Sequence, residues 1–175
     1  MGRPHASADG YVFHRPCSHG RRRADWYGEA ACSVGTVTIE TFWRGAFTSQ
    51  EANLLHAEAF GTRMFTVSEW DWRGLVDAHS LGWVTARVTP VGETSELIGF
   101  VNVVSDGLVH AWIQDVMVAT VARRQGIGQQ LVRAAADGAR RARCEWLHVD
   151  FEDDLRSFYF DACGFSPTNA GLLSL

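Results

Sequence analysis

Three β-rich segments follow one another along the chain and are joined by short polar turns. They span Leu81–Thr89, Leu97–Val104 and Leu108–Val118. Segments of this length with turns between them are most simply an antiparallel meander. A chain of 175 residues, 46% apolar and 21% charged, can bury its own core around such a sheet. The pattern therefore predicts one globular domain with a sheet at its centre.

Helical and extended patterns alternate on both sides of the meander. Capping boxes begin at Thr48 and at Ser68 and mark two helix starts. The expected flanking elements are a strand from Val37 to about Gly45, helices at about Thr48–Phe60 and Ser68–His79, a helix to about Arg141, a strand at Trp146–Phe151, a helix at about Asp153–Ala162 and a short strand near Leu172. The order is about βααβββαβαβ. The fold class is thus mixed α/β (α+β), a mostly antiparallel central sheet flanked by helices.

The first 34 residues show no sustained period and are expected to be a flexible or disordered leader, which leaves 35–175 as the domain. His14, Cys17, His19 and Cys32 match no common zinc spacing, so no metal is expected. The net charge of −4 disfavours nucleic acid as a partner. There is no Cys-x-x-Cys pair and no long apolar run, which favours a cytoplasmic protein without a membrane segment.

A glycine loop follows the meander. Gly126 and Gly128 come after Arg123 and Arg124, and the helical pattern starts there. A strand, a glycine loop and a helix present backbone amides at a helix N-terminus, where the dipole favours an anion. The arginines add charge, and the missing Cβ atoms let a ligand approach. The loop alone also fits a tight structural turn. With the arginines it predicts a pyrophosphate site.

The motif Arg123-x-x-Gly126-x-Gly128 resembles motif A of the GNAT superfamily of N-acetyltransferases, and the segment from Asp150 to Gly164-Phe165 resembles the family's next motif. The resemblance implies the GNAT fold, acetyl-CoA as cosubstrate and direct attack by an amine. It also implies that pantetheine pairs with strand 110–118 where that strand splays from 146–151. The cofactor-binding residues it implies are Val116, Met117 and Val118 near the thioester, and Arg123, Arg124, Gln125, Gly126, Ile127, Gly128 and Gln129 at the pyrophosphate.

The transfer needs a base for the acceptor amine and an acid for the thiolate. The family often has a tyrosine four residues before the Gly of Gly-Phe, where this chain has Phe160. Tyr159 is the candidate acid if the helix there is irregular, and packing is the alternative. Asp115 is the candidate base because it interrupts an apolar strand. Its alternative is a scaffold role. His110, His148 and Asp150 are second choices for the base.

The acceptor is expected to be a small-molecule or protein amine. Four aromatic residues, Phe65, Trp70, Trp72 and Trp83, could line its pocket or could fill the core, and Glu69, Asp71 and Asp77 could receive a cation. A catalytically weak acyl-CoA sensor or scaffold is the alternative function, since the tyrosine is displaced. A toxin acting on aminoacyl-tRNA is disfavoured by the acidic domain. By analogy with the family, the chain could form a homodimer through a sheet edge.

Overall fold

The computed structural model describes residues 8–11, 37–89 and 94–175. Six strands form one sheet in chain order, and all neighbours are antiparallel except β5 and β6, which are parallel. The strands are β1 (Ala8–Tyr11), β2 (Val37–Trp43), β3 (Gly82–Thr89), β4 (Glu96–Ser105), β5 (His110–Val118) and β6 (Trp146–Val149). The predicted meander is thus confirmed as β3, β4 and β5. Strand β1 lies in the expected leader, the rest of which, with the four residues weighed as a zinc site, falls outside the described residues.

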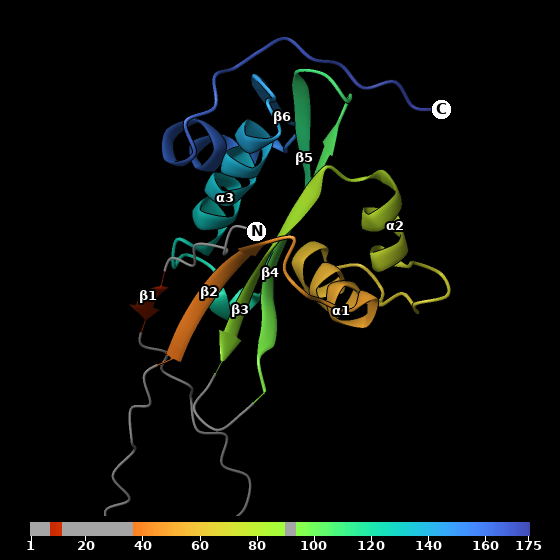
Figure 1. The fold of residues 1–175 in the computed structure, drawn as a ribbon, viewed down its shortest axis with the longest axis vertical. Helices are drawn as coiled ribbons and strands as arrows, with labels where there is room; N and C mark the ends of the chain where they lie inside the picture. Colours follow the sequence, from red (N-terminus) through yellow and green to blue (C-terminus); the bar gives the residue numbers. More distant parts are fainter. Residues whose placement is uncertain (1–7, 12–36, 90–93) are drawn as a thin grey trace, which may run out of the picture.

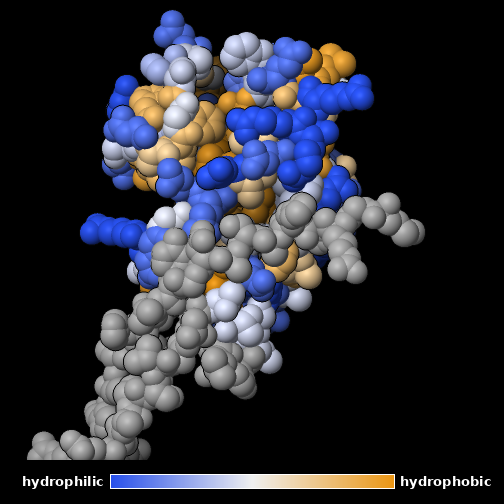
Figure 2. All heavy atoms as spheres, turned by 60° about the vertical axis from the view of Figure 1, so that its left-hand side comes forward, coloured by the Kyte–Doolittle hydropathy of each residue, from blue (hydrophilic) through white to orange (hydrophobic). Residues whose placement is uncertain are grey.

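The helices lie on both sides of the sheet (Figure 1). Helices α1 (Ser49–Phe60) and α2 (Trp72–His79) lie on one face, and α3 (Ile127–Arg141) packs on the other. Helix α3 carries exposed arginines at 133, 140 and 141. The surface seen from its side has hydrophilic side chains next to apolar ones (Figure 2). The mixed, mostly antiparallel fold expected from the sequence is therefore present.

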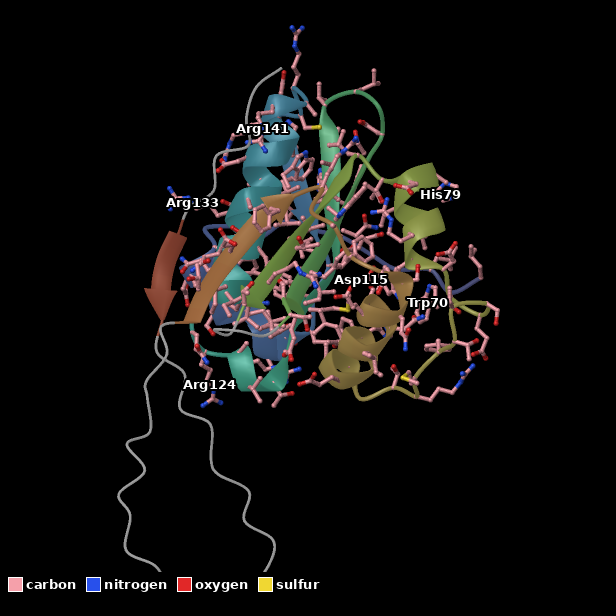
Figure 3. The ribbon with its side chains drawn as sticks, turned by 60° about the horizontal axis from the view of Figure 1, so that its bottom comes forward. Trp70, His79, Asp115, Arg124, Arg133 and Arg141 are labelled. Carbon is pink, nitrogen blue, oxygen red and sulfur yellow. The ribbon has the colours of Figure 1, made fainter. Side chains whose placement is uncertain are left out.

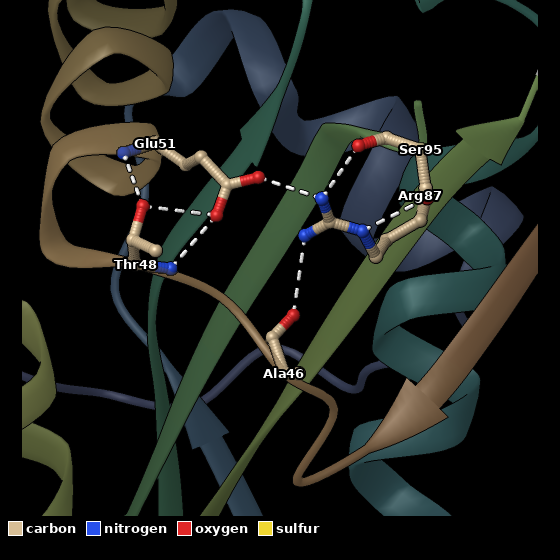
Figure 4. Close-up of polar contacts among 5 residues, drawn as sticks. All are labelled: Ala46, Thr48, Glu51, Arg87 and Ser95. Carbon is tan, nitrogen blue, oxygen red and sulfur yellow. Dashed lines mark hydrogen bonds and ion pairs between the residues drawn. The ribbon is translucent and has the colours of Figure 1, made fainter. Parts of the chain in front are cut away.

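Helix α1 begins with the capping box predicted at Thr48. The Thr48 side chain accepts a hydrogen bond from the Glu51 amide at 3.1 Å, and Glu51 accepts one from the Thr48 amide at 2.8 Å. Arg87 on β3 donates to Glu51 at 2.6 Å and also to the carbonyls of Ala46 and Ser95 (Figure 4). One guanidinium thus joins the start of α1 to the sheet.

The second predicted helix starts later than expected. A box at Ser68 was the predicted signal, but α2 begins at Trp72 with Asp71 as its N-cap residue. Residues before it form a turn in which Glu69 accepts hydrogen bonds from the amide and hydroxyl of Thr66. The same side-chain chemistry that caps a helix closes a turn here.

The core has one layer on each face of the sheet. Phe100 and Met117 are paired across β4 and β5 and are fully buried, and Phe100 packs edge-on against Trp72 of the α1/α2 side. On the other face, Gly99 leaves room for Leu131 of α3, whose Cδ1 would lie 3.0 Å from a Cβ on that glycine. Alternation along β4 therefore sends successive side chains to opposite layers.

The end of the chain departs from expectation. The predicted helix at 153–162 is a 3-10 turn, η2 (Asp153–Leu155), followed by a turn of π-helix, η3 (Ser157–Ala162). The strand predicted near Leu172 is wrong, because residues 163–175 form no regular element. The apolar residues there, Leu172, Leu173 and Leu175, are highly exposed and do not alternate across a sheet face.

Candidate functional site

The parallel strands β5 and β6 separate halfway along β5. Their pairing runs from His110 opposite Trp146 to Ile113 opposite Val149, where β6 ends while β5 continues to Val118. A hollow of about 590 Å³ opens at this splay. Its lining comes from both strands, from α1, from η3 and from the C-terminal segment, and includes Phe60, Gln114, Asp115, Val116, Asp150, Phe151, Tyr159 and Leu172. The splay expected from the sequence is therefore a real opening in the sheet.

A β-bulge lies at the mouth of this hollow. Phe100 pairs with Met117 and Asn102 with Gln114, so two residues of β5, Asp115 and Val116, face one residue of β4. Asp115 has a φ of 53°, in the left-handed region that few non-glycine residues adopt. Bulges of this kind re-aim side chains beside functional sites. Here the bulge turns both Asp115 and Val116 toward the hollow.

Asp115 has an ionisable neighbour that the sequence reasoning missed, His56 of α1. Burial raises the pKa of Asp115, and the charge of His56 partly opposes that rise. Burial also lowers the pKa of His56, with Asp115 acting in the opposite direction. Only 7% of His56 is exposed, and its Nδ1 lies 3.2 Å from the Thr62 hydroxyl. The two groups form an electrostatic pair that links α1 to the bulge, and Figure 3 shows Asp115 next to α1.

Aromatic rings surround His56 and fix its position. Its ring centroid lies 4.7 Å from Trp70, 4.8 Å from Phe60 and 5.8 Å from Trp72. Phe60 also lines the hollow beside Asp115. Helical spacing places residues 56 and 60 on one face of α1. The sequence spacing therefore predicts that residues 56 and 60 are neighbours. It does not predict that His56 lies near Asp115 of β5, because only the tertiary fold brings those two residues together.

The glycine loop leads from β5 into α3 as predicted. After a short 3-10 turn, η1 (Thr120–Ala122), Arg124 has a φ of 60° and Gly126 has a φ of 78°. Helix α3 starts at Ile127, and no side chain caps it. The amides of the first helical turn, at Ile127, Gly128 and Gln129, have no intrahelical acceptor. They form the anion-binding end of the α3 dipole.

The two arginines of the loop differ in their surroundings. Arg123 donates to the Val118 carbonyl at 3.1 Å and to the Ala59 carbonyl at 3.1 Å, so its guanidinium joins the end of β5 to the end of α1. Arg124 is exposed and projects from the loop (Figure 3). Gln125 donates to the Val121 carbonyl at 3.0 Å and braces the loop internally. The charge presented to a ligand is thus mainly that of Arg124.

Tyr159 reaches the hollow because η3 is a π turn. The amide of Cys163 donates to the Phe158 carbonyl at 3.0 Å, five residues back. A π turn holds one residue more than an α turn, and π turns often occur at functional sites. Tyr159 lines the hollow, whereas Phe160 packs against Phe151 at 5.3 Å between ring centroids. The irregular helix that Tyr159 required is present.

The environment of Tyr159 keeps its hydroxyl protonated. Burial, with a smaller contribution from Cys163, raises the pKa of Tyr159 to about 12. Its ring stacks on Phe151 at 4.6 Å, and only 5% of the residue is exposed. Within the described ranges no group hydrogen-bonds to the hydroxyl. The oxygen can therefore donate its proton to a ligand in the hollow.

Comparison with known proteins assigns the chain to a family. The model of the acetyltransferase (GNAT) family matches residues 36–165. The chain belongs to the GNAT family. It is accordingly an acyltransferase, as the sequence resemblance predicted. Among curated proteins, a search finds no significant match to this sequence.

Several solved structures share the fold. An acetyltransferase from Trypanosoma brucei has a TM-score of 0.62 at 18% identity, covering 78% of this chain and 99% of its own. Glucosamine-6-phosphate N-acetyltransferase from Arabidopsis thaliana has a TM-score of 0.57 at 17% identity, covering 77% of this chain and 97% of its own. The structure of AAC(6')-Iy with the bisubstrate analogue CoA-S-monomethyl-acetylneamine has a TM-score of 0.59 at 14% identity, covering 78% of this chain and 97% of its own.

The remaining residues expected at the GNAT cofactor site lie around the end of β5. The side chain of Met117 belongs to the core, and only its backbone can reach a ligand. Val118 lies beside α3, since its Cγ2 is 3.8 Å from where a Cβ on Gly128 would stand. The Gln129 side chain donates to the Ala162 carbonyl and joins α3 to η3. These contacts bring the loop, the splay and η3 together.

The expected aromatic wall divides into two parts. Trp72 and Trp83 are core residues whose indole N–H groups donate to Asn53 and to the Gly45 carbonyl. Phe65 and Trp70 are half-buried and pack edge-on at 4.6 Å. The proposed cation-binding carboxylates, Glu69, Asp71 and Asp77, already have partners in Arg63, Ser49 and Arg73. The acceptor wall is therefore smaller than the sequence suggested.

Among the described residues, no group of three or more His, Cys, Asp or Glu side chains could hold a metal ion. Across the same ranges, no helix has the length and apolar character needed to cross a membrane.

Proposed function

We propose that this acyltransferase moves the acetyl group of acetyl-CoA to a primary amine by direct attack in a ternary complex. One observation carries the proposal: the β5–β6 splay, with its bulge at Asp115 and Val116, opens beside the α3 N-terminus. A thioester in the splay would thus lie within reach of a base, an acid and a set of backbone donors. Direct attack also requires no enzyme nucleophile, and neither Ser nor Cys lines this hollow.

The α3 N-terminus fits a pyrophosphate. The free amides of Ile127, Gly128 and Gln129 would donate to its oxygens, and Arg124 would add a full charge. Nothing lies within 4 Å of a Cβ position on Gly126, so the loop is open on that side. Beyond Val149, no strand of the described residues lies beside this edge of β5, and the pantetheine amides would pair there between Val116 and Val118.

The chemistry in the splay follows from charge development. When the amine attacks, the thioester oxygen becomes negative, and a backbone amide near Val116–Val118 would stabilise it by about 3 kcal/mol. Asp115 would take a proton from the ammonium form of the acceptor, and its raised pKa makes it a stronger base than an exposed carboxylate. Tyr159 would donate a proton to the leaving thiolate. The charge of His56 would partly offset the cost of burying the Asp115 carboxylate.

The acceptor would enter from the α1 side of the splay. Phe60 is half-exposed there and lines the hollow, next to the rings that enclose His56. An apolar or aromatic amine fits this surface better than a polycation, whether it is a small molecule or a protein side chain. The rings would cover the hydrocarbon part of the acceptor, while the ammonium group would reach Asp115.

Titration calorimetry with acetyl-CoA tests the donor site directly. We expect saturable binding that Gly126→Arg abolishes, and an absence of binding at millimolar ligand would overturn the proposal. Thiol release over a panel of alkyl and aryl amines tests turnover. Binding without thiol release from any amine would instead favour the alternative, an acyl-CoA sensor.

A further inference from the structure

Two histidines lie side by side on the acceptor face of the splayed strands. His110 begins β5, and His148 is opposite Trp112 in the β5–β6 register. The Nδ1 of His110 and the Nε2 of His148 are 2.7 Å apart, a full hydrogen bond. Both side chains lie on the face opposite Ala111 and Ile113, which are buried under α3.

The ring packing holds this pair in place while leaving it accessible. Trp112 stacks on His148 with ring centroids 4.8 Å apart and an angle of 18° between the planes. Trp146, paired with His110, is 62% exposed, and both histidines are half-buried. Helix α1 packs on β4 and β5, whereas the main contact of β6 is with β5. The pair is thus held by its hydrogen bond and by the Trp112 ring, and it remains partly exposed.

A hydrogen bond between two neutral imidazoles determines where their protons lie. One inner nitrogen must donate and the other must accept. The outer nitrogens, Nε2 of His110 and Nδ1 of His148, have no partner within the part of the chain that the structure describes. One of them carries a hydrogen and the other has a free lone pair. The pair can therefore accept a proton at one end and release another from the opposite end.

The two ends of the pair face different surroundings. His148 lies next to Val149, the last residue of β6, and Val149 and Asp150 both line the splay hollow. His110 follows the β4–β5 turn, where exposed Asp106 accepts a hydrogen bond from the His110 amide at 3.2 Å. Glu145 also lies near this end, since its amide donates to the Val109 carbonyl. The pair therefore runs from the splay toward carboxylates in contact with solvent.

We propose that His110 and His148 form a two-imidazole relay that carries the acceptor's proton out of the splay. This rests on the proposed function, in which an ammonium ion and acetyl-CoA become an amide, free coenzyme A and one net proton. Asp115 first takes that proton and then releases it, through water in the hollow, to Nδ1 of His148, which returns Asp115 to its carboxylate form. The proton on Nε2 of His148 then passes to Nδ1 of His110, and the proton on Nε2 of His110 leaves for water. Exchange with water restores the starting tautomers.

The first test requires neither substrate nor turnover. Nitrogen-15 spectra of the full chain labelled at histidine should show one imidazole N–H that exchanges slowly with water because it lies in the hydrogen bond. That resonance should disappear in both His110→Gln and His148→Gln. The matched control is His79→Gln, an exposed histidine on α2, which should leave the resonance unchanged. A spectrum without a protected imidazole N–H would overturn the relay.

The second test uses the best amine found in the thiol-release panel. Each single variant should lower kcat by about 10²-fold, as expected for a lost proton-transfer group, with KM for acetyl-CoA unchanged. Millimolar imidazole added to His148→Gln should restore part of kcat, which a merely structural role would not allow. Full kcat in both variants would overturn the relay. If the wild type releases no thiol, the proposed function fails, while the spectra still report on the pair.

Discussion

The ring of Phe158 lies 3.1 Å from the point where a Cβ on Gly128 would stand. This contact joins the first turn of α3 to the π turn that carries Tyr159. A side chain at position 128 would push the ring away and disturb both ends of the site. Gly128→Ala should therefore cost about 1–3 kcal/mol of unfolding free energy through overpacking, measured by urea denaturation. It should also weaken acetyl-CoA binding, measured by calorimetry.

Gly126 differs from Gly128, because its constraint is conformational. Its φ of 78° nearly equals that of Gly107 in the β4–β5 turn at 79°, and nothing crowds either residue. Ala at either position should cost about 1–2 kcal/mol in stability. Only Gly126→Ala should weaken acetyl-CoA binding. Equal binding by both variants would show that the loop does not hold the pyrophosphate.

The position of Tyr159 in the π turn gives a test of the acid. Tyr159→Phe should lower kcat by about 10²-fold or more, with acetyl-CoA binding retained. Because the pKa of Tyr159 is about 12, its hydroxyl stays protonated at neutral pH. The wild-type kcat should therefore not fall through ionisation of Tyr159 at or below neutral pH. The double variant Tyr159→Phe/Phe160→Tyr should stay inactive, since residue 159 lines the hollow and residue 160 is not among its lining residues. Recovery in that double variant would exclude the π-turn explanation.

Local patterns predicted the parts of this molecule that local physics determines. The meander, the box at Thr48 and the glycine loop were found because alternation, capping and turn chemistry act within a few residues. The predicted helix start at Ser68 was wrong because a Thr66–Glu69 box, two residues earlier, closes a turn instead. The C-terminal strand was wrong because its pairing depends on a distant edge.

Only part of the candidate site could be predicted from the sequence, because the rest depends on long-range contacts. The loop and Asp115 could be found, but His56 became relevant only because the bulge and α1 bring it near Asp115. The π turn that aims Tyr159 depends on one extra residue between Phe158 and Cys163. No sequence period reports such an insertion.

The two loop arginines should respond differently to substitution. Arg124→Gln removes an exposed charge, so acetyl-CoA affinity should fall and should depend less on salt. Arg123→Gln breaks two hydrogen bonds to carbonyls of β5 and α1, so thermal stability should fall as well. Calorimetry at two salt concentrations measures the affinity of each variant for acetyl-CoA, and melting curves measure its stability. Together they distinguish the two variants. The prediction fails if Arg123→Gln loses affinity with no loss of stability.

The Arg87–Glu51 contact predicts how stability depends on acid. Burial acts to raise the pKa of Glu51, but hydrogen bonds from Arg87 and Thr48 outweigh it and lower the pKa below 4.5. Its contribution is present above 4.5 and is lost as pH falls through the lowered value. Glu51→Gln should cost about 1–2 kcal/mol at pH 7, and the difference from wild type should shrink in acid. Glu96→Gln, at an exposed glutamate, is the control.

Asp115 should oppose stability while serving catalysis. Burial raises its folded pKa above 3.8, only partly offset by His56. The folded chain therefore holds this proton more tightly than the unfolded chain, so stability falls as pH rises from 3.8 through the raised value. Above that window the buried charge remains a cost. Asp115→Asn should then raise the melting temperature at pH 7, and the gain should vanish at the lowest pH.

Asp115→Asn should also lower kcat by about 10²-fold or more, because the amide cannot accept the ammonium proton. Asn tolerates the left-handed φ at this position, so the bulge should persist. Asp137→Asn, on the exposed side of α3, is the matched control and should change neither activity nor its pH profile. A variant at Asp115 that gains no stability and keeps the wild-type pH profile would assign the base to another group, and the histidine pair would be the next to test.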